Sequence, residues 1–548
     1  MISALRQNWK PLLLLAVLSF VLIFWHLGST TLWQGDEGIY AEIAREMHES
    51  GNIITPHYNY APRFDKPPLY FWLTSLLYMF LGISEFTVRF WPAFFGFATV
   101  MLTYLMGTRL WNRATGLISA VVMLTCMQNV VQSRVAIMDT MLTFWLLLCI
   151  YCLINWYRDN NWKQFYIASI AAGFAVLVKG PVGVIFPAVV LGISLLIKKD
   201  LKRVLNPRVL TGFILFILIA APWYIAAYIQ NGAVFINDFF GYQNIARYTK
   251  AIEQHGAPWF FYFIILFAGF FPWSPFLLIP GAKLVEKITN MGSGTKDQGS
   301  VKTHHSNISF ESIFFIVWSL FIFVFFSFSQ SKLPGYIFPI FPVLALSVGK
   351  GIKEGIEQLG NIGTKRLVYG SFVLFLICTG LLITAMVYVL KITPPSETPI
   401  DITLLYPLII ILTAGAVLTL LSLIRIKYSR VIITLTITLF FGFMVNSILP
   451  QMERDKGINS IGKYIHKTIS GNTRVGAYIN VEPREVFYAR RKIDLLKEEN
   501  DLFDFINKPE HVVILKRKDY LSLVKKGNKG YKLIYTTGDY ALIRGNSK

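Results

Sequence analysis

Residues 209–229 read VLTGFILFILIAAPWYIAAYI, an apolar run without a charged side chain. About 20 such residues in helical form cross the hydrocarbon core of a bilayer. Comparable runs recur through most of the chain, and of its 548 residues 54% are hydrophobic and only 15% are charged. Soluble proteins carry about 25% charged residues. The sequence therefore predicts a polytopic α-helical membrane protein.

Basic residues lie at the ends of the apolar runs, although the net charge of +21 could by itself suggest a nucleic-acid partner. At such positions Lys and Arg orient spans and contact anionic membrane lipid, so no nucleic-acid partner is predicted. Arg6 and Lys10 place the N-terminus in the cytoplasm, and the apolar run that follows is predicted to be a first span. Further inner-side clusters are Arg109 with Arg113, Lys198 to Arg203, Lys350 to Arg366, and Arg425 to Arg430.

The segment Leu69–Gly82 decides the parity of the spans. It is short and follows Lys66-Pro-Pro68, and counting it as a span would move every later basic cluster to the outer side. We therefore predict that it is a helix lying in the outer interface. The predicted spans, about thirteen in number, cover residues 11–27, 89–108, 114–131, 140–157, 164–178, 182–197, 209–229, 259–282, 311–328, 337–349, 367–390, 403–424 and 431–449.

After the last span the composition changes to that of a soluble domain. Val475–Ile479 and Val512–Leu515 are predicted to be strands, and Tyr531–Arg544 is predicted to be a terminal hairpin. An odd number of spans places this domain outside, in the periplasm. The predicted division is a transmembrane catalytic domain at 1–450, with a large periplasmic loop at 28–88, and a soluble α/β domain at 451–548.

Polar residues from distant parts of the chain collect on the predicted outer face. A charge near hydrocarbon costs on the order of 2.5–3.5 kcal/mol, and it persists where it is paired or lines a functional cavity. Cations bind the phosphate of an anionic headgroup, and carboxylates act on a polar neighbour, so this mixture predicts a binding site. The candidate residues are Asp36, Glu37, Lys66, Arg134, Asp139, Lys179, Arg247 and Tyr336.

Each candidate also has a structural interpretation. Asp36 and Asp139 could cap the helices that they open, and Lys66 could extend from an interfacial helix toward water. Arg247 and Tyr336 could be interface anchors. The charged residues that follow Asp36 at helical spacing are predicted to form a solvated helix face. These residues are Glu42, Arg45, Glu46 and Glu49.

The order of the motifs resembles that of the GT-C glycosyltransferases. The motifs are Trp33-Gln-Gly-Asp-Glu-Gly-Ile-Tyr40, Asp65-Lys-Pro-Pro68, the outer Asp139 and Lys332-Leu-Pro-Gly-Tyr336. Within that class the chain is most similar to the bacterial lipid A aminoarabinose transferases, relatives of the protein O-mannosyltransferases, over essentially its whole length. The resemblance implies transfer of 4-amino-4-deoxy-L-arabinose from an undecaprenyl phosphate carrier to lipid A phosphate, a lipopolysaccharide modification linked to polymyxin resistance. The site would face the periplasm from the bacterial inner membrane.

The resemblance also implies roles for individual residues. Asp36 and Asp139 match the catalytic acids of the first and second outer loops. Relatives often have Glu where Asp65 stands here, and this shorter side chain puts a metal contact in doubt. No metal or other cofactor is therefore assigned. The residues implied in substrate binding are Lys66, Arg247 and Tyr336, expected around the carrier phosphate, together with Glu37, Lys179 and Arg134.

In the implied reaction an acceptor oxygen attacks the anomeric carbon while the carrier phosphate leaves. Lys66, Arg247 and Tyr336 would stabilise the charge that develops on that phosphate. A hydroxyl acceptor would need a general base such as Asp36, whereas a lipid A phosphate is already ionised and needs none. In the second case Asp36 and Asp139 would orient the donor sugar. The sequence leaves both roles open.

Two other functions fit parts of the pattern. The same transfer chemistry could act on a protein hydroxyl or another envelope glycan. A transporter would also have many spans, but it should place polar residues near the bilayer midplane and often show repeated halves. Here the charges cluster on one face and no repeat is evident. The expected partners are therefore the lipid-linked donor, an envelope acceptor and membrane lipid, with the protein acting as a monomer.

Overall fold

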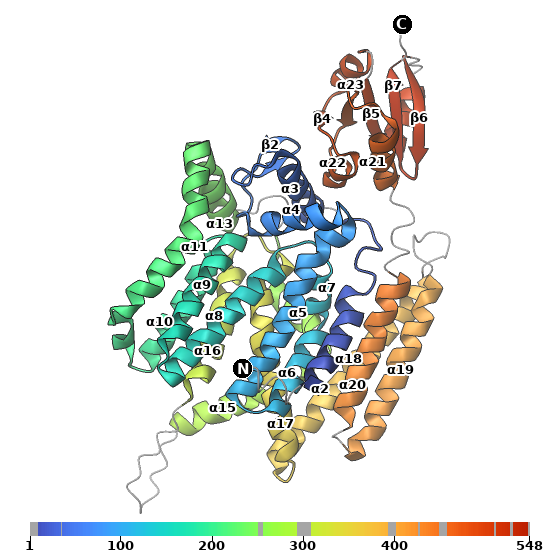
Figure 1. Cartoon of the computed structure of the whole chain (residues 1–548). Coiled ribbons are helices and arrows are strands. Elements are labelled where there is room, and N and C mark those ends of the chain that lie inside the picture. Colours follow the sequence, from blue (N-terminus) through green and yellow to red (C-terminus); the bar gives the residue numbers. More distant parts are fainter. Residues whose placement is uncertain are drawn as a thin grey trace, which may run out of the picture.

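The computed structural model describes residues 9–33, 35–249, 256–292, 308–392, 402–425, 428–448, 457–508, 511–525 and 530–545. It is a bundle of long helices with a small α/β domain at one end (Figure 1). This end is uppermost in Figure 1, and we call it the upper end of the bundle. The opposite end carries α15 (Leu278–Gly292) and the last turns of α17 (Phe341–Glu357).

Each predicted span overlaps a helix in the described residues. By length and composition alone, eight helices in the described part of the chain could cross a membrane, or up to ten if each of two bent pairs counts as one span. The other predicted spans, α2 with η1, α9 and α10, are helices that are shorter or less apolar, so the predicted count of about thirteen is higher than this criterion supports. The bundle comprises α2 (Trp9–Ser19), η1 (Phe20–Phe24), α5 (Glu85–Leu110), α6 (Arg113–Thr125), α7 (Met127–Ser133), α8 (Asp139–Asp159), α9 (Trp162–Lys179), α10 (Val182–Ile197), α11 (Arg208–Asn231), α14 (Phe261–Gly269), η4 (Ser274–Leu277), α15, α16 (Phe310–Phe328), η5 (Pro334–Ile340), α17, α18 (Ile362–Ile392), α19 (Leu405–Ser422), α20 (Ser429–Phe443) and η9 (Met444–Ile448).

Two predicted spans are not straight helices. The span predicted at 114–131 bends by 62° between α6 and α7, and the span predicted at 259–282 bends by 107° between α14 and the segment formed by η4 and α15. Pro272 lies at the second break, where its ring removes a backbone donor and obstructs the preceding turn. The two breaks meet, because the Met127 amide donates to the Phe271 carbonyl at 3.0 Å. Backbone groups freed by bending are thus satisfied inside the protein, as a membrane setting requires.

The loop between the first two bundle helices folds over the upper end. It contains α3 (Asp36–Ser50), a ribbon of β1 (His57–Tyr58) and β2 (Ala61–Pro62), and α4 (Leu69–Leu81). Helix α4 packs on α3, with the rings of Tyr40 and Phe71 6.0 Å apart. Both helices lie above the bundle rather than within it (Figure 1). This position agrees with the interfacial helix predicted at 69–82.

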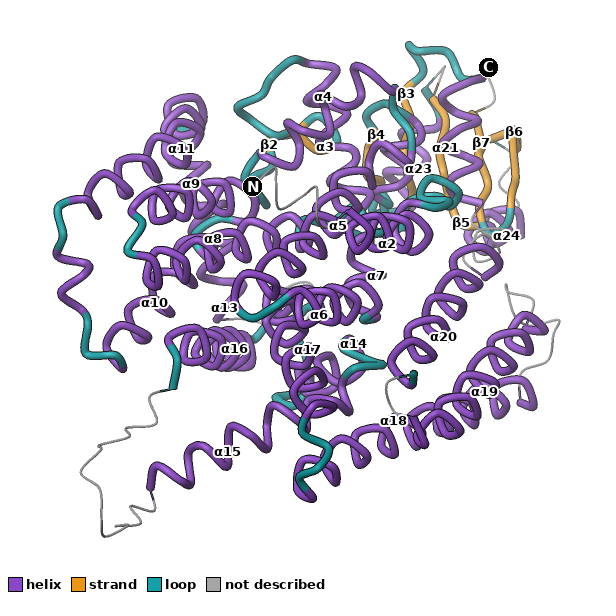
Figure 2. Tube along the Cα trace, turned by 60° about the horizontal axis from the view of Figure 1, so that its bottom comes forward, coloured by secondary structure: helices purple, strands orange, loops and turns teal. Residues whose placement is uncertain are grey.

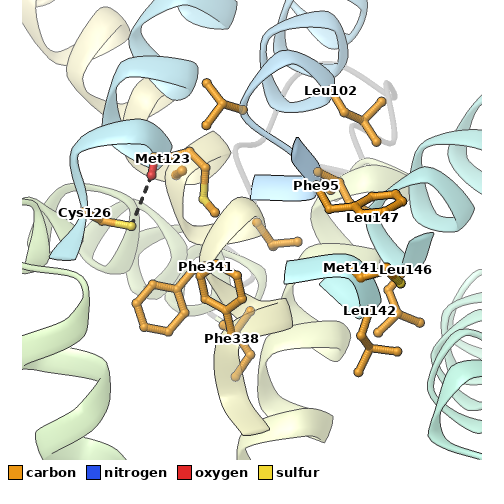
Figure 3. Packing of buried hydrophobic residues seen from close by; sticks show 14 of the residues in the cluster. Phe95, Leu102, Met123, Cys126, Met141, Leu142, Leu146, Leu147, Phe338 and Phe341 are labelled. Carbon is orange, nitrogen blue, oxygen red and sulfur yellow. Dashed lines mark hydrogen bonds between the residues drawn. The ribbon is translucent and has the colours of Figure 1, made fainter. Parts of the chain in front are cut away.

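A continuous apolar core fills the bundle. Figure 3 shows Phe95 of α5, Met141 of α8 and Phe341 of α17 converging from helices far apart in sequence. At the bend between α6 and α7 the Cys126 thiol donates to the Met123 carbonyl at 3.2 Å, and both side chains belong to this core (Figure 3). In the turned view of Figure 2, α10 and α11 lie at one edge of the bundle and α18 and α19 at the other, with α6 and α17 between them.

Between α11 and α14 the chain returns to the upper end. This segment contains α12 (Ala233–Phe235), the π-helix η3 (Ile236–Ala246) and α13 (Arg247–Thr249). Elsewhere, short 3-10 turns join or extend neighbouring bundle helices at η2 (Leu201–Leu205), η7 (Ile402–Leu404) and η8 (Leu423–Arg425).

The C-terminal residues form the expected α/β domain, with a five-stranded sheet in the order β4-β3-β5-β7-β6. Strand β3 runs parallel to β4 and β5, whereas β7 runs antiparallel to β5 and β6. Both predicted strands and the predicted hairpin are present; β4 was not predicted. The boundary predicted at residue 450 lies outside the described residues. The elements are α21 (Gly457–Thr468), β3 (Arg474–Tyr478), α22 (Pro483–Ala489), β4 (Ile493–Leu496), α23 (Glu499–Ile506), β5 (His511–Lys516), α24 (Arg517–Lys525), β6 (Tyr531–Thr537) and β7 (Tyr540–Gly545).

Candidate active site

Two neighbouring cavities at the upper end share Lys66, Lys179 and Tyr336. The larger is a groove of about 420 Å³ with mainly apolar walls. The smaller, of about 30 Å³, is a polar chamber that is also lined by Asp36 and Asp139. Five of the eight predicted site residues, drawn from distant parts of the chain, therefore line the polar chamber, and three of them also line the groove.

Lys179 and Asp139 form an ion pair in the polar chamber. The Lys179 ammonium donates to Asp139 Oδ1 at 2.5 Å and lies 4.9 Å from the centre of the Tyr336 ring. Lys179 is the last residue of α9 and Asp139 is the first residue of α8. A cation at a helix C-terminus and an anion at a helix N-terminus both favour the helix dipole. The helix ends thus hold the pair where the two cavities meet.

The turn that carries Tyr336 packs directly over the Asp139 carboxylate. A Cβ atom added to Gly335 would lie 2.6 Å from Asp139 Oδ2, closer than such atoms approach, so only glycine leaves this carboxylate its room. The turn is held by Gln128, whose amide donates to the Pro334 carbonyl at 3.2 Å. Lys332 stabilises the chain just before this turn, because its buried ammonium donates to the Ser329 carbonyl at 2.6 Å.

Asp36 opens α3 beside the chamber and is half-buried. Its carboxylate has no hydrogen-bond or ion-pair partner among the residues that the structure describes, and it makes no side-chain cap of the helix. The cap position is taken by Gly35, whose φ of 80° lies in the region that favours glycine. Of the two acids in the chamber, Asp36 is therefore the one without a paired cation in the described part of the chain.

Lys66 lies at the boundary of the cavities on a segment that is held by side-chain contacts. Its neighbour Asp65 is bound by Arg63 at 2.5 Å and by the Gln243 amide at 2.9 Å. Gln243 belongs to η3, so this contact ties the first loop to the segment that follows α11. The sequence did not identify Gln243 as a site residue, because a single Gln in an apolar loop gives no signal by itself.

Aromatic side chains line much of the larger groove. The ring centres of Phe326 and Tyr336 are 5.0 Å apart, as are those of Tyr248 and Phe325. Aromatic and aliphatic walls of this kind suit a hydrocarbon chain, and Lys66 and Lys179 line the same groove. The aromatic residues of the groove are Phe186, Phe239, Phe240, Tyr248, Phe325, Phe326 and Tyr336.

Glu37 does not reach either cavity. It is only 1% exposed, and Arg89 binds both of its carboxylate oxygens at 2.8 and 3.0 Å. The carboxylate also accepts from the backbone amides of Trp33 and Ala136 at 2.5 and 2.8 Å. All of this acceptor capacity is taken up inside the protein, so Glu37 fixes the loops around the site rather than contacting a substrate.

The structure does not show Arg134 or Arg247 in the substrate-binding position that the sequence predicted. The Arg134 guanidinium donates to the carbonyls of Ile23 at 2.8 Å and of His26 at 3.3 Å, and thereby caps the end of the first helix instead of lining a cavity. Lys and Arg commonly satisfy the last carbonyls of a helix in this way. Arg247 begins α13, but its side chain lies outside what the structure describes, so its expected phosphate contact stays a prediction.

The helix face that was predicted to be solvated is buried, and that prediction is wrong. Glu42, Arg45 and Glu46 are 0%, 2% and 3% exposed, in a helix that packs against α4 and β1 of its own loop and against α22 of the C-terminal domain. Arg45 binds Glu42 at 2.7 Å and the more exposed Glu49 at 2.8 Å. Burial, together with the nearby Glu42 carboxylate, raises the pKa of Glu46 to about 8. Charge periodicity could not reveal this burial, since other elements of the first loop and of the C-terminal domain pack on the helix.

A metal was not assigned from the sequence. Within the described ranges, no three His, Cys, Asp or Glu side chains are grouped so as to hold a metal ion.

Comparisons with known proteins give the site its context. Residues 13–236 match the protein family described as dolichyl-phosphate-mannose-protein mannosyltransferase. The chain is 30% identical over 377 residues to an uncharacterized protein of Aquifex aeolicus, an alignment covering 68% of this chain and 79% of that protein. It is 31% identical over 346 residues to the undecaprenyl phosphate-alpha-4-amino-4-deoxy-L-arabinose arabinosyl transferase of Erwinia tasmaniensis. That alignment covers 61% of this chain but only 57% of the transferase, less than two thirds of its length.

Solved structures share the fold. The crystal structure of ArnT from Cupriavidus metallidurans bound to undecaprenyl phosphate superposes with a TM-score of 0.79 at 20% identity, over 97% of each chain. The archaeal oligosaccharyltransferase AglB from Archaeoglobus fulgidus gives a TM-score of 0.55 at 12% identity, over 98% of this chain and 74% of that one. The chain thus shares its overall fold with these two proteins. The chain is therefore similar to the protein mannosyltransferases over residues 13–236 and to an aminoarabinose transferase over 61% of its length, and it shares the fold of the solved ArnT.

Proposed function

We propose that the protein transfers a sugar of the 4-amino-4-deoxy-L-arabinose type from an undecaprenyl phosphate carrier to a phosphate of lipid A. The observation that carries this proposal is the pair of cavities that share Lys66, Lys179 and Tyr336. One is a groove of about 420 Å³ with mainly apolar walls, and the other is a small chamber with two carboxylates. A lipid-linked sugar has the same division, with a hydrocarbon tail, an anionic phosphate and a polar sugar.

The comparisons support the choice of donor and acceptor. The Erwinia tasmaniensis relative is named for aminoarabinose transfer, and the Cupriavidus metallidurans ArnT structure holds undecaprenyl phosphate. By analogy we place the prenyl tail in the aromatic groove and the phosphate beside Lys66 and Lys179. We also place the upper end of the bundle at the periplasmic face of the bacterial inner membrane, as the basic clusters predict.

The chemistry follows from this placement. An acceptor oxygen forms a bond to the anomeric carbon while the bond from that carbon to the carrier phosphate breaks, and the phosphate leaves with the electron pair. Lys66, Lys179 and the Tyr336 hydroxyl are arranged to stabilise the charge gained by the leaving phosphate. Arg247 is proposed to add a bidentate contact, for which a guanidinium is well suited.

The two acids take different roles in this scheme. Asp139 forms an ion pair with Lys179 and thereby holds the Lys179 ammonium at the boundary of the two cavities. Asp36, which has no paired cation among the described residues, faces the space for the sugar. A lipid A phosphate is ionised near neutral pH and needs no general base, so we propose that Asp36 orients the donor through its amino group. A hydroxyl acceptor, on a protein or another envelope glycan, would instead require Asp36 as the base.

Mass spectrometry of lipid A tests this function. Cells that make the protein should carry lipid A whose mass is increased by one or two aminopentose units, and deletion of the gene should remove the addition. Asp36→Asn should lower it modestly if Asp36 orients the donor, and near-complete loss would instead indicate a general base. Polymyxin susceptibility should rise in parallel. Unchanged lipid A in cells that make the wild-type protein would contradict the proposed acceptor. Purified protein supplied with the lipid-linked donor would then show whether another acceptor is used.

A further inference from the structure

We propose that the C-terminal domain is a positioning element of the active site, because its helix α22 holds the turn that carries Asp36 from both sides. This proposal rests on the proposed function, in which Asp36 contacts the donor sugar. The contacts of Pro483 and Tyr488 with the first loop carry the argument, and we call these two residues the α22 clamp.

The first contact of the clamp lies on the N-terminal side of Asp36. The Tyr488 hydroxyl accepts a hydrogen bond from the Leu32 backbone amide at 3.0 Å, in a buried position. The same hydroxyl donates to Glu85 Oε1 at 3.0 Å, at the start of α5. One phenol thus joins the loop before Asp36 to the first turn of a bundle helix. A buried amide that lost this acceptor would be left unsatisfied, so the contact is costly to break.

The second contact lies on the C-terminal side of Asp36. Gly38 packs so closely on α22 that an added Cβ would lie 2.9 Å from Pro483 Cβ and 3.2 Å from the Arg484 backbone nitrogen. The first turn of α3 is therefore seated on the first turn of α22. Asp36 lies between Leu32 and Gly38, the two points at which the domain fixes the first loop.

The clamp belongs to a wider, well-packed contact. Tyr488 is 6% exposed, and its ring belongs to the same apolar core as Leu32 and Tyr40. Farther along the first loop, the Asn59 side chain donates to the Ile493 carbonyl at 2.8 Å and accepts from the Ile493 amide at 2.9 Å. Ile493 begins β4, which is an edge strand of the sheet. The side-chain amide of Asn59 therefore makes the hydrogen bonds that a neighbouring strand would otherwise make. Specific contacts therefore fix the position of the C-terminal domain on the first loop.

The consequence concerns catalysis more than folding. The chamber that contains Asp36 is small, about 30 Å³, so a modest displacement of the α3 start changes the position of the carboxylate relative to the sugar. A misplacement of about 1 Å remote from the chemistry can cost roughly 100-fold in rate. The α22 clamp accounts for a C-terminal domain that carries no catalytic residue of its own in the proposed mechanism.

The test compares Tyr488→Phe with Tyr464→Phe in the full-length protein reconstituted in lipid nanodiscs. Both substitutions remove one hydroxyl from the same domain, but Tyr464 stacks on Tyr535 within the domain, with ring centres 4.4 Å apart. Amide hydrogen exchange of a peptide spanning 28–40 reports on the turn, and sugar transfer reports on the reaction. For Tyr488→Phe we expect faster exchange in this peptide and a kcat lowered roughly ten-fold, with KM for the donor within about two-fold of wild type. Tyr464→Phe should behave as wild type in both measurements.

The outcomes separate the two proposals. Exchange and kcat that both stay at the wild-type values in Tyr488→Phe would overturn the clamp, as would faster exchange with unchanged kcat, since the turn would then move without effect on the reaction. A rise in KM with unchanged kcat would point to a donor-binding role and would also overturn it. If the wild type transfers no sugar, the proposed function falls, and the exchange measurement alone decides whether α22 orders the turn.

Discussion

Lys179 Nζ lies 2.5 Å from Asp139 Oδ1, across the boundary of the two cavities and 4.9 Å from the Tyr336 ring. The side chains of Lys179 and Asp139 are 15% and 12% exposed, so the pair is largely withdrawn from water. A cation held in this way is already in place before a phosphate arrives, which is the arrangement that stabilises a leaving group efficiently. The acid and the base should therefore act as one unit.

Removal of either member of this unit should impair transfer to a similar extent. We expect Lys179→Met and Asp139→Asn each to lower kcat roughly 100- to 1,000-fold, the usual effect of losing one preorganised donor. The double substitution should cost little more than either single one, because coupled residues are not additive. Turnover of purified variants measures this. Lys163→Met, which changes an exposed lysine at the other end of α9, is the matched control. Additive losses would show that the two residues act separately.

Gly335→Ala should displace the Asp139 carboxylate without unfolding the protein. The added methyl group would lie 2.6 Å from Asp139 Oδ2, and the mobile carboxylate can rotate away more easily than the backbone can shift. We expect turnover to fall at least ten-fold with the melting temperature nearly unchanged. Gly192→Ala is the control, since in the described part of the chain no atom beyond its own helix backbone and its two neighbours lies within 4 Å of its added Cβ. Equal turnover in the two variants would contradict the packing argument.

The sequence was sufficient for the features that depend on local pattern. Apolar runs predict the bundle helices, and short apolar segments bounded by polar residues predict β3, β5 and the terminal hairpin. The charge pattern of the loops predicts that Lys66, Lys179 and Tyr336 share one face, and all three line the same two cavities. The bends were not predicted, because hydropathy along the chain does not report where two broken helices satisfy each other's backbone.

Residue pairing across long separations was also beyond the sequence. Glu37 pairs with Arg89, 52 residues away, and Lys179 pairs with Asp139, 40 residues away. One signal was available for the first pair: an arginine that begins an apolar run must find a partner inside the protein. For α3 the charge periodicity gives no signal of burial, since the helix is packed against α4 and β1 of the first loop and against α22 of the C-terminal domain.

The Glu37–Arg89 pair should be a main determinant of stability. Both side chains are nearly inaccessible, with exposures of 1% and 2%, and breaking such a pair leaves a buried charge uncompensated. We expect Arg89→Met to destabilise the protein by about 3–5 kcal/mol. Arg109→Met breaks the exposed Arg109–Asp159 pair, whose side chains are 52% and 40% exposed, and should cost at most about 1 kcal/mol. Thermal unfolding of the two detergent-purified variants compares them, and similar losses would argue against a special role for Glu37.

The C-terminal domain should become less stable as pH rises from about 4.3 to about 8. Glu485 is 2% exposed, and burial raises its pKa to about 8, against about 4.3 for glutamate in an unfolded chain. The folded domain therefore binds more protons than the unfolded chain between these values. Stability is greatest below the unfolded pKa, falls through the window by at most about 1.4 kcal/mol per pH unit, and is constant above it with respect to this group. Glu46 of α3 also has its pKa raised to about 8, so its ionisation should lower the stability of the folded first loop over the same pH range.

Glu485→Gln isolates this contribution, because an amide occupies the same space and cannot ionise. We expect hydrogen exchange of a peptide spanning 474–489, corrected for the intrinsic effect of pH, to accelerate between pH 5 and pH 8 in the wild type. The increase should be much smaller in Glu485→Gln, so that the variant is the more protected protein at pH 8 and no more protected at pH 5. Asp504→Asn removes an exposed carboxylate of α23 and should follow the wild type. Greater protection of the wild type at pH 8 than at pH 5 would reverse the sign of the linkage and contradict the buried, protonated Glu485.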